Sequence, residues 1–106
     1  MVKGDIVLVL FPFSDLAGNK LRPALVIGSS PDEVTVLFIT SQIKWPEPTD
    51  ILLNPDSING IKKQSLLRVS KIATLDRILI KGKLGVIDND TLQKADDNLK
   101  IFLRLL

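Results

Sequence analysis

The sequence predicts a mainly β protein, a small and strongly bent antiparallel barrel that is followed by one C-terminal α-helix. Short stretches rich in β-branched and other apolar residues are separated by Gly, Pro, Asn and Asp, which punctuate turns. Helical periodicity occurs only near the C-terminus, and strands that do not alternate with helices argue against a parallel α/β sheet. The 106 residues are enough for one domain with a single hydrophobic core.

The expected strands follow one another through short connections. In order they are DIVLVLF (5–11), RPALVIGS (22–29), VTVLFITSQI (34–43), DILL (50–53), QSLLRVSKIAT (64–74) and IKGKLGVI (80–87). The segment 12–21 is expected to be a loop, because Pro, Gly and Asn punctuate it. Both alternating sets of side chains in 34–43 are largely apolar, which predicts a strand covered on both faces. We expect 64–74 to bend in the middle and LDRIL (75–79) to form a single helical turn.

One amphipathic helix is predicted over about 89–105, after a barrel that covers about 1–87. Its apolar residues recur at spacings of three and four: Leu92, Ala95, Leu99, Phe102, Leu103 and Leu106. Asp88 or Asp90 can cap the helix N-terminus. We expect the apolar stripe to pack on the core, and its end to be apolar enough to join a dimer contact. Strands closed by a helix in this way indicate an SH3-like antiparallel barrel.

Residue types that are missing exclude several kinds of chemistry. The chain contains no His, no Cys and no Tyr. Disulfides, a structural zinc site, and Ser-His-Asp, Cys-His or paired-histidine mechanisms are therefore excluded. Catalysis near neutral pH would have to rely on Arg, Lys, carboxylates or hydroxyls. No signal peptide is evident, and no apolar run approaches the roughly 20 residues that span a bilayer, so we expect a soluble, cytoplasmic protein without a membrane partner.

The charge is uneven, although the net charge is only +2. Between Gly60 and Gly85 the single acidic residue is Asp76, and the stretch carries a net charge of +6. Its cations are Lys62, Lys63, Arg68, Lys71, Arg77, Lys81 and Lys83. Such a basic zone indicates an anionic partner, but a solvated face of the barrel explains the charges equally well. The adjacent pair Lys62 and Lys63 is interpreted as solvated lysines in a loop.

Arg22 lies at the junction between a loop that contains Lys20 and the second expected strand. Junctions between loops and a rigid scaffold suit binding and catalytic side chains, and a guanidinium can grip a phosphate through two hydrogen bonds. Pro23 is ordinary at a strand start, because its missing N–H costs least there. The alternative is a surface arginine that pairs with Asp15.

Polar side chains that end or interrupt later strands are further candidates. Thr40, Ser41 and Gln42 end the third expected strand, where a hydroxyl could donate to a phosphate oxygen or simply cap a turn. Arg68 interrupts SLLRVS and would face either solvent or a ligand groove. Trp45, in a loop with two prolines, could stack on an exposed nucleobase or fold back on its own domain.

Four segments resemble the MazF/PemK family of bacterial toxins: KGDIVLVLFPFSD, KLRPALVIGS, FITSQI and SLLRVSKIATLDRILIKGKLGVID. Their order and spacing are similar to those of the family over nearly the whole chain. The resemblance implies the barrel fold of the MazF, PemK and CcdB toxins, a homodimer, and a cognate antitoxin as partner, with DNA binding at most indirect through the antitoxin. It also implies a sequence-specific endoribonuclease that cleaves single-stranded mRNA without a metal or other cofactor and leaves 2′,3′-cyclic phosphate and 5′-OH ends.

The resemblance also implies roles for individual residues. Arg22 and Thr40 match the catalytic arginine and threonine of the family. The residues expected to bind RNA are Ser41, Gln42, Lys20, Arg68, Lys71 and Trp45. Family members that use an arginine at the position of Arg68 carry an acidic residue two positions later, where this chain has Ser70. We therefore expect no Arg–Asp pair on that strand, which places the acid–base burden on Arg22 and Thr40.

Two other functions are considered. A non-catalytic toxin of the same fold would inhibit a protein target such as DNA gyrase, but Arg22, Pro23 and Thr40 favour the nuclease. A generic SH3-like module for peptides is favoured least. Peptide grooves are lined with aromatic side chains, and this chain has one Trp and no Tyr.

Overall fold

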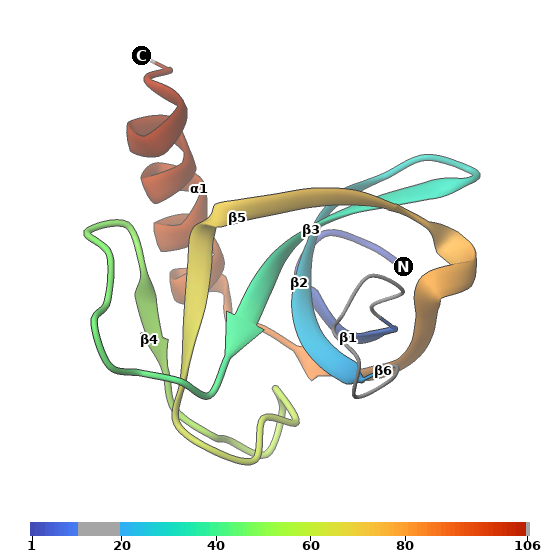
Figure 1. The fold of residues 1–106 in the computed structure, drawn as a ribbon, viewed down its shortest axis with the longest axis horizontal. Helices are drawn as coiled ribbons and strands as arrows, with labels where there is room; N and C mark the ends of the chain where they lie inside the picture. The colour runs from blue at the N-terminus through green and yellow to red at the C-terminus, as the bar shows by residue number, and fades with distance from the viewer. Residues whose placement is uncertain (11–19, 106) are drawn as a thin grey trace.

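The computed structural model describes residues 1–10 and 20–105 and contains one six-stranded antiparallel sheet (Figure 1). The strands are β1 (Asp5–Leu10), β2 (Leu21–Ser29), β3 (Glu33–Thr40), β4 (Ile51–Leu53), β5 (Ser65–Asp76) and β6 (Ile80–Val86). They pair in the order β4-β5-β3-β2-β1-β6, and helix α1 (Asn89–Leu103) follows the last strand. The expected loop at 12–21 falls mostly on residues 11–19, which lie outside the described residues.

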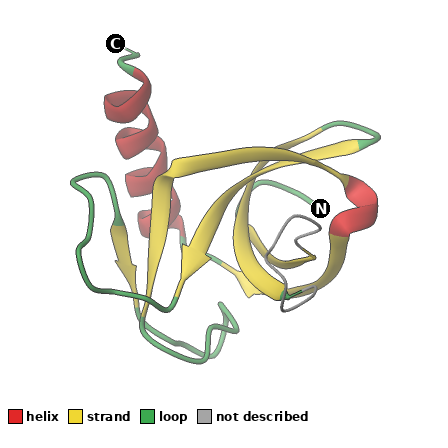
Figure 2. Ribbon diagram, in the orientation of Figure 1, coloured by secondary structure: helices red, strands yellow, loops and turns green. Residues whose placement is uncertain are grey.

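The sheet curls strongly, but hydrogen bonds do not close it into a complete barrel. Among the described strands, β4 and β6 are the two edges of the pairing order. β5 crosses the fold and continues through a short 3₁₀-helix, Arg77–Leu79, directly into β6 (Figure 2). The prediction of a mainly β antiparallel fold with a C-terminal helix is confirmed. The strongly bent sheet is not closed by hydrogen bonds, because the chain joins β5 to β6 by that 3₁₀-helix instead of pairing them.

The predicted bend in the fifth strand is confirmed, and a β-bulge is its cause. Leu37 of β3 lies opposite Ile72 of β5, whereas the next residue, Phe38, lies opposite Arg68. Residues 69–71 are therefore extra on β5, and such bulges bend the strand that carries them. Only Arg77–Leu79 is helical in the stretch where a helical turn was expected.

The prediction that the third strand reaches residue 43 is wrong. β3 ends at Thr40. The Thr40 hydroxyl accepts a hydrogen bond from the backbone N–H of Gln42 at 3.1 Å. A local side-chain bond of this kind offers the backbone an alternative to strand pairing, so the chain turns there. The other strand boundaries lie within two residues of the expected ones.

Apolar side chains cover both faces of β3, as expected. Val34 and Val36 belong to one buried cluster, and Leu37 and Ile39 belong to the other. α1 packs on the second cluster through Ala95, with Leu92 and Leu99 beside it. The end of the helical stripe is not core: Ile101, Phe102, Leu103 and Leu105 are exposed.

Asp88, not Asp90, is the N-cap residue of α1. Its carboxylate accepts hydrogen bonds from the Thr91 backbone N–H at 2.9 Å and from the Thr91 hydroxyl at 2.7 Å. These bonds from Thr91 lower the pKa of Asp88. Arg104, in the left-handed conformation, ends the helix two residues earlier than expected. Across residues 1–10 and 20–105 we find no helix that is both long enough and apolar enough to span a membrane.

Replacing Asp88 by Ala is expected to lower the free energy of unfolding by about 1 kcal/mol near neutral pH, the usual effect of losing an N-cap. The pKa of Asp88 is lower in the folded chain than in the unfolded chain. Its stabilising contribution is therefore complete above the ordinary pKa near 4 and is lost as the pH falls through the lowered value. Urea unfolding at pH 7 and pH 3 measures both effects. Asp97→Ala, on the exposed face of α1, is the control, and an equal loss in both variants would contradict the capping role.

Candidate functional site

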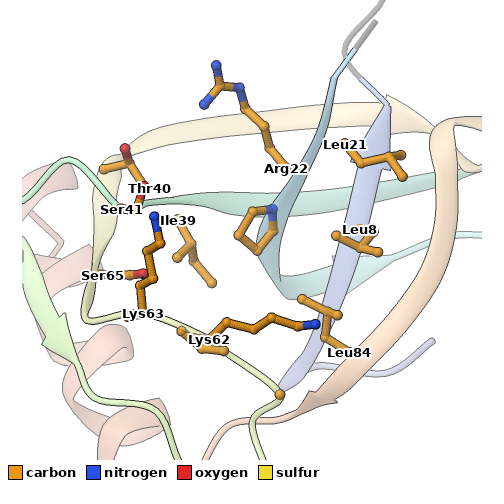
Figure 3. A pocket seen from close by; sticks show the side chains of 13 residues that line it. Leu8, Leu21, Arg22, Ile39, Thr40, Ser41, Lys62, Lys63, Ser65 and Leu84 are labelled. Atoms are coloured by element: carbon orange, nitrogen blue, oxygen red, sulfur yellow. The ribbon is translucent and has the colours of Figure 1, made fainter.

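A groove of about 450 Å³ opens at the end of the sheet where β2 begins and β3 ends (Figure 3). Its floor is apolar and is formed by Leu8, Pro23, Ile39, Ile61 and Leu84. Its polar lining residues are Arg22, Thr40, Ser41, Lys62, Lys63 and Ser65. An apolar concave surface with a few cations and hydroxyls around it can bind an anionic ligand that also carries a flat apolar part.

The structure brings Arg22 and Thr40 together at the rim of this groove. Ala24 of β2 pairs with Phe38 of β3, and Arg22 and Thr40 each lie two residues farther along. Because side chains alternate between the faces of a strand, Arg22 and Thr40 extend from the same face of neighbouring strands. In Figure 3 both side chains extend away from the floor residue Ile39.

Thr40 is held in a defined position by the chain that follows it. Its Oγ1 accepts the Gln42 N–H, so the hydroxyl oxygen is fixed while the hydroxyl hydrogen can still point to a ligand. Arg22 is exposed and forms no ion pair within the described residues. Asp15, its alternative partner, lies outside the described residues. Both side chains therefore present hydrogen-bond donors on the same face of the sheet.

Lys62 and Lys63 are exposed, as expected for solvated lysines in a loop, and they also line the groove. In Figure 3, Lys63 extends toward Ser41, and Lys62 extends across the floor toward Leu84. The only sequence signal for them was the basic zone between Gly60 and Gly85. Their loop lies far from Arg22 in the sequence, so only the fold could bring these three cations to one cavity.

The buried side chain of Asn59 organises the loop that carries these lysines. Its Oδ1 accepts hydrogen bonds from the backbone N–H groups of Ile61 at 2.9 Å and Asp56 at 3.3 Å. Its Nδ2 donates to the carbonyl of Asn54 at 3.0 Å. A buried amide that satisfies its partners in this way holds a loop in one conformation.

Two glycines let this loop lie directly against β6. A Cβ atom on Gly60, whose φ is +72°, would lie 2.3 Å from the carbonyl oxygen of Leu84. A Cβ on Gly85 would lie 2.1 Å from the carbonyl oxygen of Ile58. At this crossing the Val86 N–H donates to the same Ile58 carbonyl at 3.0 Å. This close approach fixes the distance between the loop and β6, and therefore the position of Lys62 and Lys63.

Arg68 does not line the groove, because two carboxylates of the preceding loop hold it. Its Nη2 pairs with Glu47, and its Nε lies 3.1 Å from Oδ1 of Asp50. The second contact is an ion pair without hydrogen-bond geometry. The hydroxyl of Ser70 donates to the other oxygen of Glu47 at 3.1 Å. The hydrogen bond from Arg68, then the one from Ser70, lowers the pKa of Glu47.

The remaining residues expected to bind RNA are exposed but do not line the groove. They are Lys20, Gln42, Lys71 and Trp45. Trp45 is 89% exposed, so the alternative that it folds back on its own domain is wrong. Its φ is +61°. A bulky residue in the left-handed region is uncommon and needs surrounding structure to hold it there.

The basic zone is not one continuous binding face. Lys83 pairs with Asp5 at 3.3 Å. Arg77 donates to the carbonyls of Ser30 at 2.7 Å and Pro31 at 3.1 Å. Some cations of the basic zone therefore contact other parts of the protein, and others lie on the surface. Those that line the groove are Lys62 and Lys63. The part of the chain that the structure describes contains no group of three or more His, Cys, Asp or Glu placed to hold a metal ion.

Comparison with known families adds the decisive observation. Residues 2–103 match the model of a family described as PemK-like, MazF-like toxin of type II toxin-antitoxin system. The chain belongs to this family. The resemblance seen in the four sequence segments is thereby confirmed, and the MazF-like chain is a toxin of a toxin-antitoxin system.

Individual relatives agree with the family match. The MazF-like chain is 28% identical over 112 residues to Endoribonuclease EndoA of Bacillus subtilis, which covers 98% of this chain and 95% of that protein. Its fold is similar to that of a MazE-MazF structure from Deinococcus radiodurans, with a TM-score of 0.79, 22% identity, and coverage of 100% and 97% of the two chains. Mycobacterium tuberculosis toxin MazF-mt6 gives a TM-score of 0.78, 17% identity, and coverage of 96% and 98%. None of these relatives supports the gyrase inhibitor or the peptide module.

Proposed function

We propose that this MazF-like toxin is a sequence-specific endoribonuclease that cleaves single-stranded mRNA. The observation that carries the proposal is the placement of Arg22 and Thr40 side by side at the rim of a groove with Lys62 and Lys63. The relative named Endoribonuclease EndoA supports the same activity. Ser41 lines the groove beside them and would contact the same substrate.

The proposed reaction uses the 2′-OH of the RNA as nucleophile and needs no cofactor. The 2′ oxygen forms a bond to the adjacent phosphorus, the P–O5′ bond breaks, the 2′-OH gives up its proton and the leaving O5′ gains one. The products are a 2′,3′-cyclic phosphate and a 5′-OH. Arg22 donates hydrogen bonds to the non-bridging oxygens and stabilises the negative charge that develops on them. Thr40 donates its hydroxyl hydrogen to the same phosphate and helps to align it.

The partners follow from the family and from the surface of the molecule. We propose a cytoplasmic homodimer of one domain over 1–106, inhibited by a cognate antitoxin, with DNA contacted at most through the antitoxin. One solved structure similar to this chain is an endoribonuclease in complex with its cognate antitoxin, from Mycobacterial species. The exposed apolar end of α1 supports a contact with a second copy: Ile101, Phe102, Leu103 and Leu105.

Incubation of the purified protein with a long single-stranded RNA in excess EDTA tests the activity. Discrete cuts that carry 2′,3′-cyclic phosphate ends are the expected result. RNA that stays intact across many sequences and salt concentrations would contradict the proposal. Inhibition of DNA gyrase by the same preparation would then favour the non-catalytic alternative.

The double variant Lys62→Ala and Lys63→Ala is expected to bind single-stranded oligonucleotides more weakly than the native chain. If each lysine neutralises one phosphate, the slope of log K against log salt concentration becomes shallower by about 1.4 in total. Fluorescence anisotropy with a non-cleavable oligonucleotide over a salt series measures this slope. Lys94→Ala with Lys100→Ala removes the same charge from α1 and is the control. Equal changes in both double variants would mean that only net charge matters.

A further inference from the structure

We propose that Arg68 and Ser70 form a second phosphate-binding site, which the chain's own Glu47 occupies until bound RNA displaces it. The ligand is a backbone phosphate of the substrate, so the inference rests on the proposed function. It assigns a regulatory part to Glu47, whose carboxylate competes with the substrate for the same two donors.

The contacts of Glu47 are those that a phosphate could make. Arg68 Nη2 pairs with Oε1 of Glu47, and the Ser70 hydroxyl donates to Oε2 at 3.1 Å. Two donors on β5 thus bind two oxygens of one anion. A phosphodiester presents two non-bridging oxygens in a similar arrangement, and arginine binds carboxylates and phosphates through the same planar fork.

The two carboxylates beside Arg68 differ in how firmly they are held. The Asp50 side chain is 1% exposed, and its Oδ2 accepts the Glu47 backbone N–H at 2.7 Å. The Asp50 N–H donates back to the Glu47 carbonyl at 3.0 Å. The Glu47 side chain, in contrast, is 42% exposed. Exposed ion pairs contribute little to stability, so the Glu47 side chain can leave while Asp50 keeps both Arg68 and the loop backbone in place.

Arg68 lies on the same face of the sheet as the proposed catalytic residues. It pairs with Phe38, whereas Thr40 pairs with Leu66, and residues two apart in a strand share a face. Arg68 is therefore one strand across from Thr40 and about 7 Å along the sheet. An RNA strand that extends from Thr40 along this face brings a neighbouring phosphate toward Arg68.

The charges favour exchange of one anion for another. Arg68 is flanked by two carboxylates, so the cluster has an excess negative charge on the face that would meet RNA. Lys71, next to Ser70, acts on Glu47 at longer range and remains exposed. Departure of the Glu47 carboxylate removes the excess charge and opens two donors together.

The test measures binding of a 2′-O-methylated single-stranded RNA, which cannot be cleaved, by fluorescence anisotropy. Glu47→Ala is expected to bind about five- to tenfold more tightly than the native chain, the effect of freeing one charge-assisted contact. Glu47→Gln, which keeps the shape of the side chain, is expected to gain less. Ser70→Ala alone is expected to change the affinity for RNA little, because it weakens the binding of both Glu47 and the RNA phosphate to this site. In the Glu47→Ala background, Ser70→Ala is expected to remove much of the gain in RNA affinity.

Glu33→Ala removes the same charge from an exposed position at the opposite end of β3 and is the matched control. An equal gain in Glu33→Ala would overturn the site in favour of a general charge effect. If both Glu47 variants bind RNA no more tightly than the native chain, and the native chain binds and cleaves RNA, then Glu47 only stabilises the loop. In that case the inference is wrong while the proposed function stands. If the native chain and every variant leave the RNA unbound, the inference fails together with the proposed function.

Discussion

Arg22→Ala is expected to reduce the rate of RNA cleavage at least about a hundredfold, as the loss of one donor to developing negative charge does in other active sites. The free energy of unfolding should stay the same, because the side chain is exposed and forms no ion pair within the described residues. Single-turnover cleavage of a fixed RNA, with thermal unfolding beside it, measures both quantities.

Two further variants separate the role of Arg22 from its charge. Arg22→Lys keeps the charge but loses the planar fork, so we expect only partial activity. Lys94→Ala removes a cation from the exposed surface of α1 and should leave cleavage unchanged. Thr40→Val is expected to lower the cleavage rate without a large change in RNA affinity, because it removes a donor but little volume. Near-native cleavage by Arg22→Ala would contradict the proposed mechanism.

Gly85→Ala is expected to lower the free energy of unfolding by about 1–3 kcal/mol, the usual cost of forcing extra volume into a packed region. The added Cβ would lie 2.1 Å from the Ile58 carbonyl oxygen, so the loop must move away from β6. Because the same loop carries Lys62 and Lys63, RNA affinity should fall as well. Urea unfolding and oligonucleotide anisotropy measure the two effects.

Gly82→Ala is the matched control on the same strand. A Cβ at Gly82 has no neighbouring atom within 4 Å, so the substitution should change the free energy of unfolding by no more than about 1 kcal/mol. Equal stability of the Gly85→Ala and Gly82→Ala variants would mean that the crossing of loop and strand is not tight. A stable Gly85→Ala variant with native RNA affinity would show that Gly85 does not determine the position of Lys62 and Lys63.

Much of the fold was predictable because local sequence patterns encode its strands and its helix. Alternating apolar residues marked the strands, and the helical spacing of Leu92, Ala95 and Leu99 marked the helix that packs on the core. Errors arose where a local polar contact ended an element, as the Thr40 hydroxyl does at the end of β3. The pairing order of the strands, with β4 and β6 at its edges, was not predictable, because it depends on contacts between distant segments.

The candidate site was predictable in part for the same reason. Arg22 and Thr40 became candidates because each lies next to a strand end that the sequence pattern reveals, and the family resemblance implied their catalytic roles. Lys62 and Lys63 were recognised only as part of a basic zone, because their place at the groove depends on Asn59 and on the contact of Gly60 and Gly85 with distant backbone. Their sequence neighbourhood, a polar loop, is the same for a solvated lysine and for one that lines a groove.

The sequence by itself determined the strands, the helix, the family and the two residues proposed for catalysis, since each is encoded in neighbouring residues. Tertiary structure decided which cations share the groove and which are neutralised inside the protein. Arg68 shows the difference: Asp76, the carboxylate on its own strand, lies eight residues away, yet Glu47 and Asp50 reach Arg68 from another segment. Interactions between charges depend on distance in space, and the fold alone sets the distances between residues far apart in the chain.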